Sequence, residues 1–184
     1  MKIGSYLLIV LFALSYFPAS GQDWERHVSA KGNFSVMING DFRESSREVE
    51  DPVFGKLELN QYAHADSTDM GVMLYTIFYT DYPQDLVHQD STDLLKEFFL
   101  ATAESAAYSV AGNLIYSDEI HNLACPGYTW RIHYNVGDAV IRSRAYLCCS
   151  RLYILSVANL AEGVSTDNIF KFFDSFSLIS PCVN

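Results

Sequence analysis

The sequence lacks the short motifs that identify the large enzyme classes. It has no G-x-S-x-G nucleophile motif, no H-E-x-x-H zinc motif, no P-loop and no G-x-G-x-x-G dinucleotide motif. His121, Cys125 and His133 could be drawn together as metal ligands, but loop polar residues and a disulfide thiol are the more economical interpretation. We therefore expect no metal, no cofactor and a role other than catalysis.

Basic residues are scarce. The chain has 12 Lys and Arg residues against 22 Asp and Glu residues, which gives a formal net charge of −10. Nucleic-acid binding depends on neutralising phosphates with Lys and Arg, so nucleic acid is excluded as a partner. The same charge disfavours adhesion to anionic lipid.

Long apolar runs are also missing, apart from one near the start. Residues 6–17 (YLLIVLFALSYF) are shorter than the roughly 20 residues that span a bilayer. Lys2 precedes this run and small residues follow it at 18–21, which is typical of a cleaved signal peptide. We expect residues 1–21 to be removed and residues 22–184 to form one extracytoplasmic domain, periplasmic or secreted, with no transmembrane segment.

The hydrophobic periodicity of the rest predicts an α+β domain around a largely antiparallel β-sheet, flanked by one long and one short helix. Residues 72–80 are apolar on both faces, which is typical of a central strand. Asp66 belongs to a turn over residues 66–71. The predicted strands cover residues 24–29, 34–38, 42–49, 53–64, 72–80, 114–123, 128–136, 139–148, 151–160 and 176–179, and the predicted helices cover 92–108 and 166–174.

Strict alternation over residues 128–136 makes the hairpin with residues 139–148 the clearest pattern. A two-residue turn at 137–138 would place Trp130 opposite Ala145. A second tight turn at 149–150 would place Leu147 opposite Leu152.

This register predicts a cluster of cationic side chains on one face of the sheet. Arg131 would lie opposite Arg144, and His133 opposite Arg142. Like charges directly opposite each other cost stability unless something neutralises them. One interpretation is an anion site formed by arginine forks. The alternative is that acids on a nearby strand or helix, such as Asp118 and Glu119, pair with the cluster.

The four cysteines allow two disulfides with three connectivities in an oxidising compartment. The hairpin brings Cys125 beside Cys148 and Cys149, so we expect a disulfide from Cys125 to one of them, most simply Cys149. Cys182 would take the other. A redox-active pair formed by Cys148 and Cys149 is the alternative.

Several short motifs follow one another in the order seen in a family of uncharacterised bacterial exported domains. The order resembles that family's "G-x-F-S-V", "PG", "R-x-Y-L", "R-L-Y" and "F-x-x-S-F" signatures. The motifs here are GNFSV at 32–36, CPGY at 125–128, RSRAYL at 142–147, RLY at 151–153 and FFDSF at 172–176.

That family resembles the PsbP-like fold, an antiparallel sheet flanked by helices. The fold's characterised members, which include an extrinsic photosystem II subunit and a nuclear-import factor, are mostly binding or assembly modules. The resemblance implies an exported, non-enzymatic accessory module with an envelope or secreted protein partner. The alternative is a small-molecule or anion binder, or a weak hydrolase, that uses the face of Arg131, Arg142 and Arg144.

Overall fold

The computed structural model describes residues 23–68, 71–120, 125–160 and 166–180. Strands and helices follow one another in the predicted order, and most lie within two residues of the predicted bounds. They are β1 (Glu25–Ser29), β2 (Phe34–Ile38), β3 (Arg43–Asp51), β4 (Gly55–Thr68), β5 (Gly71–Asp81), α1 (Thr92–Ser109), β6 (Asn113–Ile120), β7 (Gly127–Tyr134), β8 (Ala139–Cys148), β9 (Arg151–Leu160), α2 (Thr166–Asp174) and β10 (Ser177–Leu178).

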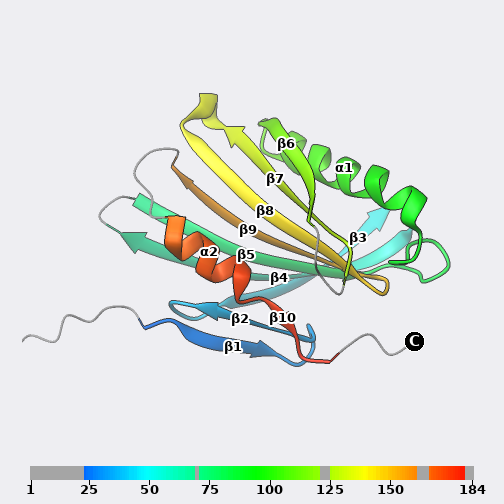
Figure 1. Ribbon diagram of the computed structural model, residues 1–184, viewed down its shortest axis with the longest axis horizontal. Helices are drawn as coiled ribbons and strands as arrows, with labels where there is room; N and C mark the ends of the chain where they lie inside the picture. The colour runs from blue at the N-terminus through cyan, green and yellow to red at the C-terminus, as the bar shows by residue number, and fades with distance from the viewer. Residues whose placement is uncertain (1–22, 69–70, 121–124, 161–165, 181–184) are drawn as a thin grey trace, which may run out of the picture.

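The strands form two antiparallel sheets, and the prediction of a single sheet was therefore wrong. The large sheet has the order β3-β4-β5-β9-β8-β7-β6, and the small sheet has the order β1-β2-β10 (Figure 1). The prediction failed because β2 pairs with β1 on one side and with β10, which is distant in the sequence, on the other. These three strands pair with one another and with no strand of the large sheet. The α+β class, the antiparallel pairing and the two flanking helices are confirmed.

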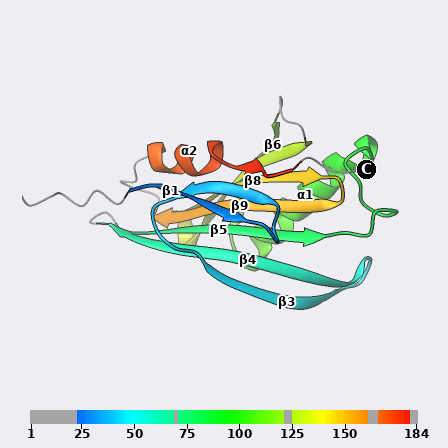
Figure 2. The same ribbon diagram turned by 90° about the horizontal axis from the view of Figure 1, so that it is seen from below.

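The large sheet separates two hydrophobic cores. On one face, α2 and the small sheet cover it, and their core includes Phe34, Tyr75 and Phe172 (Figures 1 and 2). On the other face, α1 buries Phe99 against Trp130 of β7. Both Phe99 and Trp130 are fully buried, and burial of one such side chain contributes about 1.5–3 kcal/mol.

The β7–β8 hairpin pairs in a register two residues from the predicted one. Tyr134 faces Ala139, so the chain turns through four residues rather than two, and Trp130 faces Ser143 instead of Ala145. The longer turn exists because Asn135, Val136 and Gly137 all adopt positive φ angles. Since side chains alternate with a period of two, this shift leaves every side chain on its predicted face.

The β8–β9 hairpin has the predicted register. Leu147 faces Leu152, and the strands are joined through a two-residue turn at Cys149 and Ser150. Cys149 adopts a left-handed φ of +56°, which the tight turn requires.

Strand β5 lies inside the large sheet, between β4 and β9, as its apolar sequence predicts. It is not covered along its whole length. Tyr75 and Ile77 are fully buried, whereas Val72 is 54% exposed and Leu74 is 40% exposed on the face that carries α1.

Candidate functional site

The face of β7 and β8 that α1 does not cover carries the candidate site. Arg131 of β7 lies directly opposite Arg142 of β8, because the hairpin register differs from the predicted one. Arg144 lies opposite Thr129 instead of Arg131, and His133 lies opposite Val140 instead of Arg142. The predicted cross-strand pairs were therefore wrong, while a different pair of arginines comes together.

Neutral groups are the hydrogen-bond partners of these two arginines. Arg131 Nε donates to His133 Nε2 at 2.9 Å, and Arg142 Nη1 donates to Asn159 Oδ1 at 3.0 Å. Within the described ranges, no carboxylate lies at salt-bridge distance from Arg131 or Arg142. Arg131 and Arg142 thus face each other across neighbouring strands, and the positive charge of Arg131 acts on the Arg142 guanidinium.

The pKa of Arg142 is shifted by its burial and by its position opposite Arg131. Burial lowers the pKa of the Arg142 guanidinium, and the neighbouring positive charge of Arg131 lowers it further, against a smaller opposing effect of Tyr116. Because Arg131 donates to His133 Nε2, the His133 imidazole is held with this nitrogen as an acceptor. An anion placed against Arg131 and Arg142 would reduce the repulsion between their charges.

Arg144, a third member of the predicted cluster, is already neutralised. Its Nη1 lies 2.6 Å from Asp174 Oδ1 of α2, and its guanidinium lies 5.1 Å from the centre of the Phe173 ring. Arg144 therefore pairs with an acid of the same protein, as the second interpretation expected. The acid is Asp174 of α2 and not an acid of β6. Asp118 of β6 lies opposite Thr129 and forms no ion pair with the arginines within the described part of the chain.

Cys148 ends strand β8, and Cys149 follows it in the turn to β9. Cys125 is bonded to Cys148, one of its two expected partners, with a Cα–Cα distance of 5.1 Å. Only the preference for Cys149 was wrong. The side chain of Cys148 projects into the same core as Cys125 and Tyr146, because alternate residues of a strand point to the same face. This placement explains why Cys125 bonds to Cys148 and not to Cys149. Cys149 is also in a disulfide. Cys182, its expected partner, lies outside the described residues.

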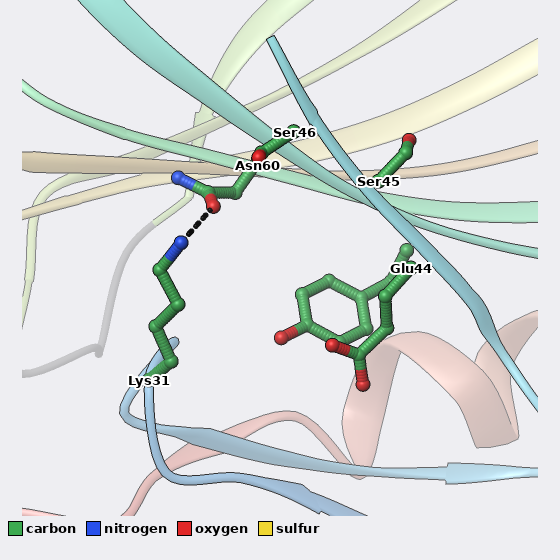
Figure 3. Close-up of a pocket in the computed structure, with 6 residues that line it drawn as sticks. Lys31, Glu44, Ser45, Ser46 and Asn60 are labelled. Carbon is green, nitrogen blue, oxygen red and sulfur yellow. Dashed lines mark hydrogen bonds between the residues drawn. The ribbon is translucent and has the colours of Figure 1, made fainter.

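A polar hollow of about 340 Å³ between the β1–β2 turn and β3–β4 is a feature that sequence reasoning missed. Figure 3 shows Lys31 and Asn60 pointing toward one another across it, with Nζ 2.8 Å from Oδ1. Lys31 Nζ also lies 2.9 Å from Glu58 Oε1. Because its only lysine is neutralised by Glu58, this hollow is a weaker candidate than the arginine pair. No sequence signal connects Lys31 with β4.

A buried carboxylate was also missed. Asp66 belongs to β4 rather than to a turn, and it is only 3% exposed. Its Oδ2 accepts a hydrogen bond of 2.6 Å from Asn39 Nδ2, whereas Oδ1 has no hydrogen-bond partner among the described residues. A sequence pattern of Asp, Ser and Thr before a glycine predicts a turn, so nothing local signalled this burial.

The described part of the chain has no helix long and apolar enough to cross a membrane and no cluster of three or more metal-ligating side chains.

No protein-family model matches the sequence, and no curated protein sequence matches it. Among solved structures, the chain is similar to the solution structure of cyanobacterial PsbP from a Synechocystis species, with a TM-score of 0.57 and 10% sequence identity. The match covers 88% of this chain and 95% of the cyanobacterial chain. The chain therefore has a PsbP-like fold.

Proposed function

We propose that this chain is an exported, non-enzymatic accessory module that binds a component of the cell envelope or a secreted protein. In this proposal, Arg131 and Arg142 hold an anionic group of that component. The observation that carries the proposal is the pair of arginines on adjacent strands, which have a histidine and an asparagine as partners and no carboxylate at salt-bridge distance among the described residues.

Export is supported by two observations, and the fold bears on the accessory role. The apolar run at residues 6–17 and the small residues after it have the pattern of a signal peptide. The bond between Cys125 and Cys148 requires an oxidising compartment to persist. The PsbP-like fold adds a bias toward accessory roles, although a fold alone does not determine a function.

The chemistry of the arginine pair favours a carboxylate or a phosphate. Guanidinium groups present planar forks of N–H donors that match the oxygens of both anions. Like charges directly opposite each other on neighbouring strands destabilise a sheet, so the folded protein gains stability when an anion lies between Arg131 and Arg142. Arg144 offers less, because Asp174 already occupies one side of its guanidinium.

Three variants of the mature chain test the proposal: Arg131→Gln, Arg142→Gln and Arg144→Gln. Isothermal calorimetry with inorganic phosphate and with a short poly-glutamate peptide measures binding, and urea titration measures the free energy of unfolding. We expect Arg131→Gln and Arg142→Gln to weaken binding at least about tenfold, since a charge-assisted hydrogen bond contributes about 1.5–3 kcal/mol. Their unfolding free energy without ligand should change little or increase.

Arg144→Gln is the matched control on the same strand. It should leave binding almost unchanged and lower the unfolding free energy by up to about 1 kcal/mol, because it removes the partly exposed contact with Asp174. The proposal fails if Arg142→Gln destabilises the fold and leaves the affinity for both anions unchanged.

A further inference from the structure

The face of the large sheet that carries α1 is only partly covered. Helix α1 packs on β6 and β7, and strands β4, β5 and β9 extend beyond it (Figure 1). At the uncovered end, Val72 is 54% exposed, Leu74 40% and Leu160 51%. Large apolar side chains gathered on one exposed face commonly mark an interaction surface.

Among the described residues, the floor of this uncovered face carries no charged side chain. Every side chain that β4 from Gln61 to Ser67, β5 and β9 turn toward it is apolar, a hydroxyl or an amide. Its central row consists of small residues, with Ala63 opposite Thr76 and Thr76 opposite Ser156. Because these side chains are short, a helix packed on this face could come close to the backbone of the strands.

The edge of this face is cationic. Arg43 and Arg47 of β3 lie opposite Ala63 and Leu59, so both arginines point to the same side as the uncovered floor. Both are exposed, and neither forms an ion pair within the described part of the chain. Arg43 also lines a hollow of about 420 Å³, whose other lining residues are Asp41, Ala63, His64, Ala65 and Leu74.

Helix α1 carries the complementary surface on its outer side. Leu94, Glu97, Ala101, Glu104 and Tyr108 follow one another at intervals of three and four residues, so they form one stripe along the helix. All five are exposed, Leu94 at 61% and Tyr108 at 88%. The stripe therefore combines apolar side chains with two carboxylates.

We infer that a second copy of this chain covers the uncovered face, and that its helix α1 is the docking element. In a two-fold symmetric dimer the same pair of surfaces meets twice, because a residue of one copy that contacts a residue of the other does so reciprocally. Helix α1 and the uncovered floor lie on the same side of the sheet, so each helix reaches the other copy's floor. Glu97 and Glu104 then meet Arg43 and Arg47, and Leu94 and Tyr108 cover Val72, Leu74 and Leu160.

Sedimentation velocity of the mature chain, from micromolar concentrations to about 1 mM, tests this inference. We expect a monomer–dimer equilibrium that weakens as salt is added, since ion pairs form the rim of the interface. The double variants Arg43→Glu/Arg47→Glu and Glu97→Arg/Glu104→Arg should each raise the dissociation constant at least about tenfold. The quadruple variant, in which both charge pairs are exchanged, should recover most of the affinity.

Two controls separate this contact from a general effect of charge. Lys31→Glu/Lys56→Glu changes the net charge as the first variant does, and Glu48→Arg/Glu50→Arg changes it as the second does, but these residues belong to other surfaces. Both controls should leave dimerisation unchanged. A chain that stays monomeric at about 1 mM, or a dimer that neither interface variant weakens, would overturn the inference.

Discussion

Buried polar groups distinguish this protein at the scale of single residues. The carboxylate of Asp66 lies beside a core that contains Met73 and Tyr75, and among the described residues only Asn39 donates a hydrogen bond to it. Tyr75 donates to the sulfur of Met73 at 3.6 Å instead. A carboxylate with so few partners costs free energy on burial, so Asp66 is a site where the fold is less stable than it could be.

Replacing Asp66 with asparagine should therefore stabilise the protein. The neutral amide keeps an oxygen that can accept from Asn39 and removes the buried charge, so we expect Asp66→Asn to raise the unfolding free energy by about 1 kcal/mol. Urea titration at pH 7 measures this change. A decrease of the same size would show that the carboxylate has a partner on which the fold depends.

Because of its buried tyrosines, the protein should lose stability at alkaline pH. Burial, and then the charge of Asp66, raises the pKa of Tyr75 to about 12. A group whose pKa is higher in the folded state contributes its full stability below the unfolded pKa of about 10 and loses it as the pH rises toward 12. We expect the unfolding free energy to fall by about 1.4 kcal/mol by pH 11 because of Tyr75.

The variant Tyr75→Phe isolates this effect. It removes one ionisable hydroxyl, so it should make the decrease in unfolding free energy between pH 9 and pH 11, measured by urea titration, smaller by the contribution of Tyr75. The buried Tyr79 and Tyr82, whose pKa values burial also raises, keep the rest of the decrease. Tyr108→Phe, at a position that is 88% exposed, should leave the decrease in place. If the two variants gave the same pH profile, ionisation of Tyr75 would not be the cause.

The individual strands and helices show which local patterns carry structural information. The period of two over β7 and the period of 3.6 over α1 predicted both elements and the faces that they bury, because each period fixes a face. The register of β7 with β8 was missed, because Gly137 and Asp138 suggested a two-residue turn while Asn135 and Val136 also take part in it. Nothing in the alternation distinguishes registers that differ by two residues.

The turn between β7 and β8 contains a strained backbone conformation at Val136, which a substitution can relieve. Val136 is β-branched, fully exposed and has a left-handed φ of +57°, a conformation that costs about 1–2 kcal/mol for such a residue. We expect Val136→Asn to raise the melting temperature and to increase the unfolding free energy by about 1 kcal/mol. The matched variant Val28→Asn, on the exposed side of β1, should not stabilise the protein. Equal effects of the two variants would contradict the claim of strain at Val136.

At the scale of the whole molecule, the features that the sequence did not predict depend on contacts between segments that are distant in the chain. The pairing of β2 with β10 joins segments whose local patterns carry no record of each other. The hairpin pattern did predict that Cys125 bonds to Cys148 or Cys149, but it did not identify Cys148 as the partner. The candidate site shows the same limit. Its residue types and its face were predicted, but the opposition of Arg131 and Arg142 depends on a turn that was misjudged.

The disulfide should contribute strongly to the stability of the whole domain. Cys125 and Cys148 are separated by 23 residues, and closing a loop of that length stabilises a fold by about 3 kcal/mol in the chain-entropy description. We expect Cys125→Ala/Cys148→Ala to lower the unfolding free energy by that amount, as measured by urea titration. A loss below about 1 kcal/mol would show that the hairpin holds these segments together without the bond.

The most direct test of the proposed function is an NMR titration of residues 22–184 with inorganic phosphate, in which the arginine Nε–H signals and the His133 ring are observed. Anion binding between Arg131 and Arg142 predicts that their Nε–H signals and the imidazole of His133 shift together with one dissociation constant, while the Nε–H signal of Arg144 moves little. A uniform shift of all arginine signals, or a shift of Arg144 alone, would contradict it.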